Sequence, residues 1–422
     1  MNPFRHRRLL LTAALMGTLF GGHGSSPRSS GAVTAVSSSE AQGWAQTGQA
    51  FLQKARETGD PTYYTRAEAV FKKALGLDPR NVEAMGGMGS LSLSRHQFRE
   101  ALAWGEQARA IHPSNATLYG IVGDACVELG DYPKAVETLQ KMVDLRPGLS
   151  AYSRISYLRE LMGDPEGAIL AMQMAVDAGG PNAENTAWCV AQLGNLYWGR
   201  GDLRLAEAQY QRALVRAPDY APALAGLARV RAAQGDFAGA AALYEQAFAA
   251  MPEHAFVEAL GDVYRALGRP GEASRKYGEA RALLRTEEAN GADVDLEMAL
   301  LEADHDMDLK DALARARREM TRRPSNIHAA DALAWALYKA GDFGEALPVI
   351  RQALRLGTED AHILFHAGMI AYRAGEREEG RAHLERALAI NPHFSIRYAD
   401  EAASVLRTLG EGGVSGEERK GR

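Results

Sequence analysis

One short pattern recurs along most of the chain, and it limits the possible folds more than any other feature. Four stretches carry a Gly-Asp turn followed by small or apolar residues at three- and four-residue intervals: GDYPKAVETLQKMVDLRP from Gly130, GDLRLAEAQYQRALVRAP from Gly201, GDFAGAAALYEQAFAAMP from Gly235 and GDFGEALPVIRQALRLGT from Gly341. This spacing predicts a helix after each turn, and the Pro that usually follows predicts where that helix ends. A repeat of this kind has to be settled before any other fold assignment.

The period places ten units between residues 41 and 392. Successive closing prolines such as Pro79, Pro113 and Pro147 are 34 residues apart. A small residue recurs at the twentieth place of every unit, namely Ala67, Ala101, Ala135, Ala168, Ala206, Ala240, Ala273, Ala312, Ala346 and Gly380. A Gly or Ala where two helices cross lets their axes approach to the roughly 8 to 10 Å of packed helix pairs. We therefore expect two packed helices in each unit.

The period of 34, the small residues at places eight and twenty, the aromatics such as Tyr210, Tyr244 and Tyr277, and the closing Pro resemble the tetratricopeptide repeat family. This resemblance covers residues 41–392. It implies an all-α, right-handed superhelical solenoid of about ten helix-turn-helix repeats. Residues 393–410 are then expected to form a helix that caps the open apolar face of the last unit.

One region departs from the repeat. The seventh unit runs into LLRTEEANGADVD, and the eighth has Leu300 where a Gly is usual and Met307 at its turn. These departures could bend the superhelix or divide it near residues 286–292.

The two ends of the chain have different compositions from the array. Arg5, Arg7 and Arg8 precede an apolar run from Leu9 to Phe20, which predicts a signal peptide over residues 1–24. The run is shorter than the roughly 20 residues needed to span a bilayer. We therefore expect export to the periplasm, the cell envelope or the medium, with an uncleaved membrane anchor as second choice. Residues 25–40 are expected to be a flexible linker, and residues 411–422 a disordered tail.

The composition argues against several function classes. A formal net charge of −5 gives no general electrostatic reason to bind nucleic acid, which also disfavours the RNA-binding class of helical repeats. Cys126 and Cys189 are too few for a cysteine-rich metal site and are expected to be buried free thiols. The chain has no phosphate-binding loop, nucleophile elbow or H-E-x-x-H motif. We expect no enzyme activity and no cofactor.

The resemblance implies that a protein or peptide partner binds the concave face, which is formed by the first helix of each unit. The aromatic and polar residues at these inner places are His328, Asp331, Trp335, Tyr338 and Lys339 in the ninth unit, Phe365, Met369, Tyr372 and Arg373 in the tenth, and Trp188, Asn195 and Trp198 in the fifth. Aromatic residues, Met and Arg are enriched in binding hot spots. Acidic residues in the seventh and eighth units suggest a partner segment that is aromatic and basic. The alternative is that these aromatics fill a narrow superhelix and contact only each other.

A metal-dependent or catalytic role is the competing hypothesis. His362 and His366 are spaced i, i+4, which places both rings on one helix face. His328, Asp331 and His305 lie on neighbouring units, but the sequence does not determine their geometry. A stable zinc site normally needs three or four ligands, so no metal site is expected here.

Overall fold

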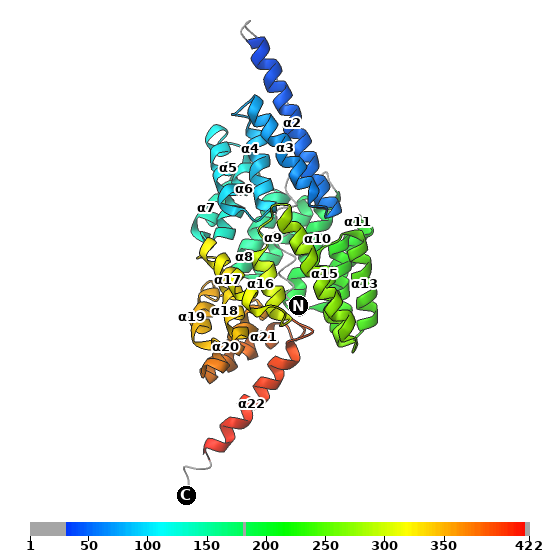
Figure 1. Cartoon of the computed structure of the whole chain (residues 1–422), viewed down its shortest axis with the longest axis vertical. Coiled ribbons are helices and arrows are strands. Elements are labelled where there is room, and N and C mark those ends of the chain that lie inside the picture. The colour runs from blue at the N-terminus through cyan, green and yellow to red at the C-terminus, as the bar shows by residue number, and fades with distance from the viewer. Residues whose placement is uncertain (1–30, 180–182, 418–422) are drawn as a thin grey trace.

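The computed structural model describes residues 31–179 and 183–417, and these residues form helices and turns without a β-strand. The expected signal peptide, residues 1–24, lies outside the described residues. The helices of the structure (Figure 1) are α2 (Gly31–Thr58), α3 (Thr62–Leu77), α4 (Val82–Ser94), α5 (Phe98–Ile111), α6 (Ala116–Leu129), α7 (Tyr132–Leu145), α8 (Leu149–Leu161), α9 (Pro165–Ala178), α10 (Ala183–Gly199), α11 (Leu203–Arg216), α12 (Ala221–Ala233), α13 (Phe237–Ala250), α14 (His254–Ala266), α15 (Pro270–Ala289), α16 (Asp295–Asp304), α17 (Leu309–Arg322), α18 (Ile327–Ala340), α19 (Phe343–Ala353), α20 (Ala361–Ala374), α21 (Arg377–Ile390) and α22 (Ala399–Glu417).

Each even-numbered helix from α2 to α20 packs against the helix that follows it, which gives ten helix pairs and confirms the all-α repeat fold. We number the pairs as units 1 to 10, and α22 follows the last of them. The expected flexible linker is wrong for residues 31–40, and the expected tail is wrong for residues 411–417, because both stretches are helical. Residues 32–40 contain no Gly or Pro that would end a helix, whereas residues 411–417 include three Gly and their helical form has no such explanation.

The Gly-Asp turn has a distinct role for each residue. Gly130 ends α6 with φ 82°, in the left-handed region that favours Gly. Asp131 then caps α7, because its carboxylate accepts a hydrogen bond from the backbone N–H of Lys134 at 3.3 Å. Gly235 and Asp236 repeat this arrangement before α13. The recurring dipeptide therefore stops one helix and starts the next.

Small residues allow the helices to pack closely, as the repeat predicts. Tyr210 of α11 is fully buried between Gly194 of α10 and Gly226 of α12. A Cβ atom added to Gly194 would lie 2.6 Å from the Tyr210 ring, and one added to Gly226 would lie 2.4 Å from it. Both distances are too short for real contacts, so the ring requires Gly on both sides.

The array turns back on itself. Turns in units 2 to 5 contact loops that lie roughly six repeats later in the chain, along a line of contact that we call the seam. Most hydrogen bonds that cross it join residues 193 to 198 positions apart, including Asp293 N to Arg95 O, Asn326 Nδ2 to Glu128 O and Asn391 Nδ2 to Trp198 O. Figure 1 shows α16 to α18 lying just below α7 and α8. One superhelical turn therefore rests on the next.

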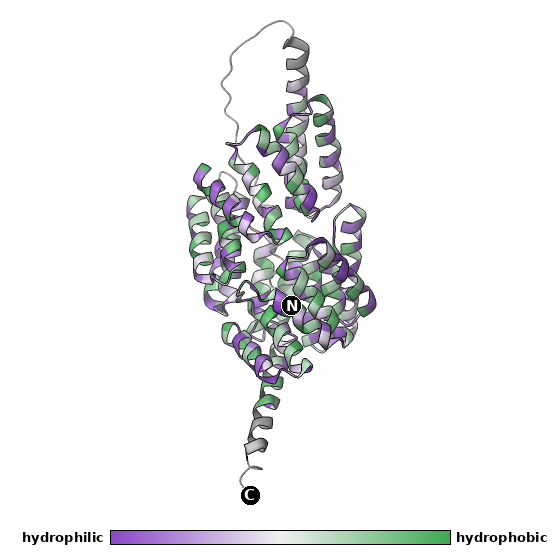
Figure 2. Cartoon of the chain, turned by 90° about the vertical axis from the view of Figure 1, so that its left-hand side faces the viewer, coloured by the Kyte–Doolittle hydropathy of each residue, from purple (hydrophilic) through white to green (hydrophobic). Residues whose placement is uncertain are grey.

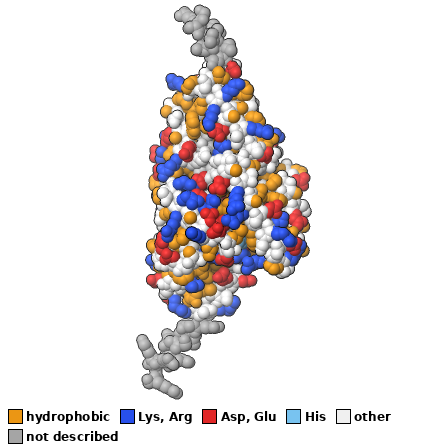
Figure 3. Space-filling view, viewed as in Figure 1, with side chains coloured by type: hydrophobic (Ala, Val, Ile, Leu, Met, Phe, Trp, Pro, Cys, Tyr) orange, Lys and Arg blue, Asp and Glu red, His pale blue; other side chains and the backbone are white. Residues whose placement is uncertain are grey.

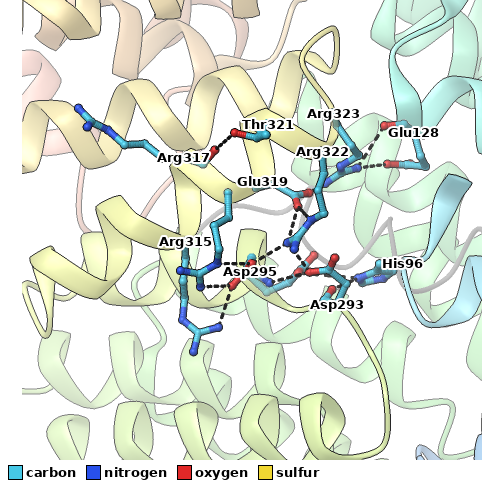
Figure 4. A network of polar contacts seen from close by, with 12 residues as sticks. His96, Glu128, Asp293, Asp295, Arg315, Arg317, Glu319, Thr321, Arg322 and Arg323 are labelled. Carbon is cyan, nitrogen blue, oxygen red and sulfur yellow. Dashed lines mark hydrogen bonds and ion pairs between the residues drawn. The ribbon is translucent and has the colours of Figure 1, made fainter.

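Charged side chains strengthen the seam (Figure 4). Arg323 donates a hydrogen bond to Glu128 Oε2 at 2.8 Å and also pairs with Glu319. Asp295, at the start of α16, accepts hydrogen bonds from the guanidinium groups of three α17 residues, Arg315, Arg318 and Arg322. The irregular region near residue 290 is thus tied to its neighbours by ion pairs.

The seam predicts a specific cost for a Cβ atom at Gly130. That atom would lie 2.0 Å from the carbonyl oxygen of Ser325 across the seam. Gly235 has the same φ of 82° but no atom within 4 Å, so it is a matched control for the left-handed backbone alone. We expect Gly130→Ala to lower the free energy of unfolding by roughly 1–3 kcal/mol more than Gly235→Ala, as measured by urea denaturation. Equal losses would mean that the seam is not formed in solution.

Surface properties agree with the composition. Helices on the outside carry both hydrophilic and hydrophobic residues (Figure 2), as amphipathic helices do. Acidic and basic side chains are intermixed on the face shown in Figure 3. Among the described residues, no helix is both long enough and apolar enough to cross a membrane. Cys126 and Cys189 are buried free thiols, and burial raises the pKa of Cys126 to about 11.

Candidate functional site

Helices α18 and α20 supply the inner wall of the last two units. Each is fixed at its start by a capping side chain. Asn326 accepts hydrogen bonds from the backbone N–H groups of His328 and Ala329 at 2.9 Å, and Asp360 accepts one from that of His362 at 2.8 Å. These caps fix the residue at which each helix begins.

Trp335 is the centre of an aromatic cluster on this wall. Its ring stacks on His366 at 4.1 Å and on Tyr338 at 4.7 Å between centroids. Its indole Nε1 donates a hydrogen bond to Asp304 Oδ1 at 2.9 Å, and only 1% of the residue is exposed. Phe365 lies beside it at 5.8 Å and is fully buried. These inner aromatics therefore contact one another extensively.

The chain's own residues Phe394–Tyr398, which we call the terminal segment, lie against this wall. The ring of Tyr398 stacks on Phe365 at 4.9 Å and meets Trp335 edge-on at 5.6 Å. Its hydroxyl donates to the backbone oxygen of Asp304 at 3.2 Å. Phe394 packs against Phe365 at 5.5 Å. Residues 393–398 thus enter the concave side before α22 begins, whereas the sequence predicts one capping helix over 393–410.

Acidic residues of units 7 and 8 adjoin the terminal segment. Arg397 contacts His305 Nδ1 at 3.0 Å and lies 4.0 Å from Asp306. His305 in turn contacts Glu258 Oε1 at 3.1 Å through its other ring nitrogen. Tyr277, which stacks on His305, donates to Asp262 Oδ1 at 2.9 Å. The basic residue of the segment therefore lies on the side of the inner face where the sequence predicts acidic character.

The fifth unit also contacts the residues around the terminal segment. The backbone oxygen of Trp198 accepts the hydrogen bond from Asn391, and its side chain lines a pocket of about 150 Å³ together with Phe394. Asn195 accepts hydrogen bonds from Tyr210 and Arg229 and is buried. Trp188 is also buried and is not part of this pocket.

The remaining inner places differ in exposure. Met369 is buried within the cluster, whereas Tyr372 is half-buried. Lys339 pairs with Asp306. Arg373 is exposed, and its guanidinium lies 4.4 Å from the centre of the Phe343 ring on α19. Arg373 is therefore not part of the aromatic wall.

His328 is separate from the aromatic cluster. It lines a pocket of about 300 Å³ where unit 4 and unit 5 meet the loop before α20 across the seam. Charged side chains at this pocket include Glu160, Arg200, Asp360 and Arg386. The sequence places His328 and Asp331 in one group, but the structure places only Asp331 near His366, with Oδ1 2.8 Å from its Nδ1.

A buried carboxylate on α16 gives a prediction about pH. Glu302 of α16 is fully buried and pairs with Arg281 at 2.8 Å. Burial raises its pKa to about 7, against the lowering effect of Arg281. This pKa exceeds the roughly 4.3 of a Glu in the unfolded chain. The folded state therefore takes up a proton at a higher pH than the unfolded state does, and the free energy of unfolding rises as pH falls through about 7.

We therefore expect Glu302→Gln, which resembles the protonated form, to flatten this dependence. Between pH 8 and pH 5, wild type should gain roughly 1–3 kcal/mol of unfolding free energy relative to the variant. Urea denaturation at four pH values measures the difference. A constant difference between the two proteins would contradict the raised pKa.

Comparison with known proteins identifies the repeat. The family model described as tetratricopeptide repeat matches residues 63–116, 87–150, 192–255, 226–294 and 332–393, which together span more than half of the chain. The chain belongs to the tetratricopeptide repeat family. The fold predicted from the 34-residue period is therefore confirmed, and this repeat fold is typical of protein-interaction scaffolds.

Curated relatives are much longer than this chain. The cellulose synthase operon protein C of Xanthomonas axonopodis pv. citri (strain 306) is 30% identical over 283 residues, which cover 67% of this chain and 16% of that protein. The cellulose synthase 1 operon protein C of Komagataeibacter xylinus is 26% identical over 174 residues, which cover 41% and 11%. This chain thus matches only a small part of either relative.

A solved structure has a similar fold at low identity. The human IFIT1 dimer with m7Gppp-AAAA aligns with a TM-score of 0.50 and 16% identity, covering 75% of this chain and 72% of that one. At this identity the likeness concerns the fold alone.

The terminal segment is the part of the site that the repeat pattern does not predict. Its signal was present in FSIRY, residues 394–398, which combines two aromatic residues with an Arg. This is the chemistry expected of a partner for the inner face, but the segment lies beyond the last repeat and was assigned to the cap.

Proposed function

We propose that this tetratricopeptide repeat protein is a non-catalytic scaffold that holds an extended protein segment on the inner face of units 8 to 10. The observation that supports this most is the terminal segment, which lies in that position and contacts Trp335, Phe365 and Asp304. A partner segment with the same aromatic and basic character would make the same contacts. It would bind by replacing the terminal segment.

Two kinds of contact would stabilise a bound partner segment, namely packing on the aromatic rings of the wall and attraction to the neighbouring carboxylates. Aromatic pairs contribute about 0.5–1.5 kcal/mol beyond their buried area. The carboxylates of Glu258, Asp262 and Asp304 favour a basic residue beside the aromatic one, and they disfavour acidic competitors. Tyr338 and Lys339 are half-buried and extend the same wall outward.

We also propose that the scaffold works in the cell envelope or outside the cell. The basic and apolar pattern of residues 1–24 supports export. The relatives are named as products of cellulose synthase operons, which agrees with this location. Partners in such a system would be other envelope proteins.

Affinity capture from envelope fractions tests the proposal. We define the released variant as Phe394→Ala with Tyr398→Ala, which weakens the terminal segment and keeps the wall. It should capture more of a specific partner than wild type, because its own segment competes less. Adding Tyr338→Ala should then reduce capture by roughly tenfold.

Circular dichroism must show the same helicity for all three proteins. Equal capture by wild type, the released variant and the triple variant would contradict binding at this face.

A further inference from the structure

Three potential metal-ligating side chains converge beside the aromatic wall. Asp304 of α16, His362 of α20 and His366 of α20 place one donor atom each within 4.8 Å of one another, and all three residues are buried. The sequence predicts only the two histidines as neighbours, because Asp304 lies in a different unit. We propose that these three residues bind one divalent transition-metal ion of the zinc class.

His366 is oriented for this role. Its Nδ1 is 2.8 Å from Asp331 Oδ1, and Asp331 is 2% exposed. A carboxylate that holds one ring nitrogen of a ligating His fixes the ring and leaves the other nitrogen for the metal. Nε2 of His366 is buried and has no hydrogen-bond partner within the described part of the chain. It is therefore the ring nitrogen available to an ion.

The donor set suits zinc and similar ions. Two imidazoles and one carboxylate with one open position are typical of sites that bind Zn²⁺ or Fe²⁺. In a tetrahedral zinc site the donors lie about 3.3 Å apart, so binding would draw the present atoms together by up to about 1.5 Å. An ion there would also compensate the buried charge of Asp304 and Asp331.

The site would link three successive units. Asp304 comes from unit 8, Asp331 from unit 9, and the two histidines from unit 10. Tyr398 of the terminal segment donates to Asp304, so the ion would lie directly beneath that segment. A bound ion would therefore stiffen the inner wall whether or not a partner binds there.

Metal analysis tests the proposal with the full chain, purified without a histidine tag and dialysed to remove loose ions. We expect one equivalent of Zn²⁺ on titration, a higher melting temperature with Zn²⁺, and a visible tetrahedral spectrum with Co²⁺. His362→Ala and His366→Ala should each abolish all three results. Asp331→Asn, which changes a positioning residue, should weaken Zn²⁺ binding by about 10- to 100-fold.

His254→Ala is the matched control. His254 is equally buried and contacts a carboxylate, Glu287 at 3.2 Å, but lies outside the cluster. The His254→Ala variant should bind Zn²⁺ as tightly as wild type does. His366→Gln, which keeps side-chain bulk, gives a second test if His366→Ala unfolds. No stoichiometric Zn²⁺ on wild type, or equal loss of Zn²⁺ from His254→Ala, would overturn the proposal.

Discussion

Arg323→Ala should lower the free energy of unfolding by about 3–5 kcal/mol, although Arg323 lies in a loop. The side chain is 4% exposed and bonds both the carboxylate and the backbone oxygen of Glu128, 195 residues away. Its removal would leave the buried Glu128 without its cation, whereas Glu319 would keep its pair with Arg322 at 3.1 Å. A buried charge that loses its partner costs more than the pair contributes, because the remaining charge stays desolvated.

Arg317→Ala is the matched control for this effect. Arg317 lies on α17, the helix that ends one residue before Arg323, and pairs with Glu345 at 2.8 Å, but its side chain is 53% exposed. Its loss should therefore cost at most about 1 kcal/mol. Chemical denaturation measures both values, and small-angle X-ray scattering should show a larger radius for Arg323→Ala alone. Similar losses for the two variants would mean that the seam contributes little.

Trp335→Ala should cost a similar amount, about 3–5 kcal/mol of unfolding free energy. The ring is fully buried among His366, Tyr338, Phe365 and Tyr398, so truncation leaves a cavity. It also removes the hydrogen bond to Asp304. Chemical denaturation followed by circular dichroism measures this loss.

Two milder variants separate packing from binding. Trp335→Phe keeps the ring but not the N–H group, and should cost roughly 1–3 kcal/mol because Asp304 loses a donor. Tyr338→Ala removes a half-buried ring and should leave the fold largely intact. A loss below about 1 kcal/mol for Trp335→Ala would show that the ring is not part of the core.

The repeat made most of the fold predictable. Its period depends on local features, namely the Gly-Asp turn, the small residues at helix crossings and the closing Pro, so ten helix pairs follow from the sequence. The same register predicts that Trp335 and Phe365 face inward. Whether they contact a partner or one another depends on the curvature of the whole array, which no single unit determines.

The seam and the terminal segment could not be predicted from local pattern. Gly130 has the same role as Gly235 within its own repeat, yet only Gly130 meets another turn of the superhelix. Asp304 and His366 likewise become neighbours only when units 8 and 10 are placed in space. Such contacts depend on small rotations between units that add up over many repeats.

The most direct test of the scaffold is whether its inner face binds a separate peptide. We would titrate a labelled peptide with the sequence of residues 391–400, NPHFSIRYAD, into wild type and into the released variant. Binding to the released variant should be at least about tenfold tighter, because in wild type the tethered segment competes at a high effective concentration. A scrambled peptide should bind neither protein. Failure of a correctly folded released variant to bind the peptide would contradict the account.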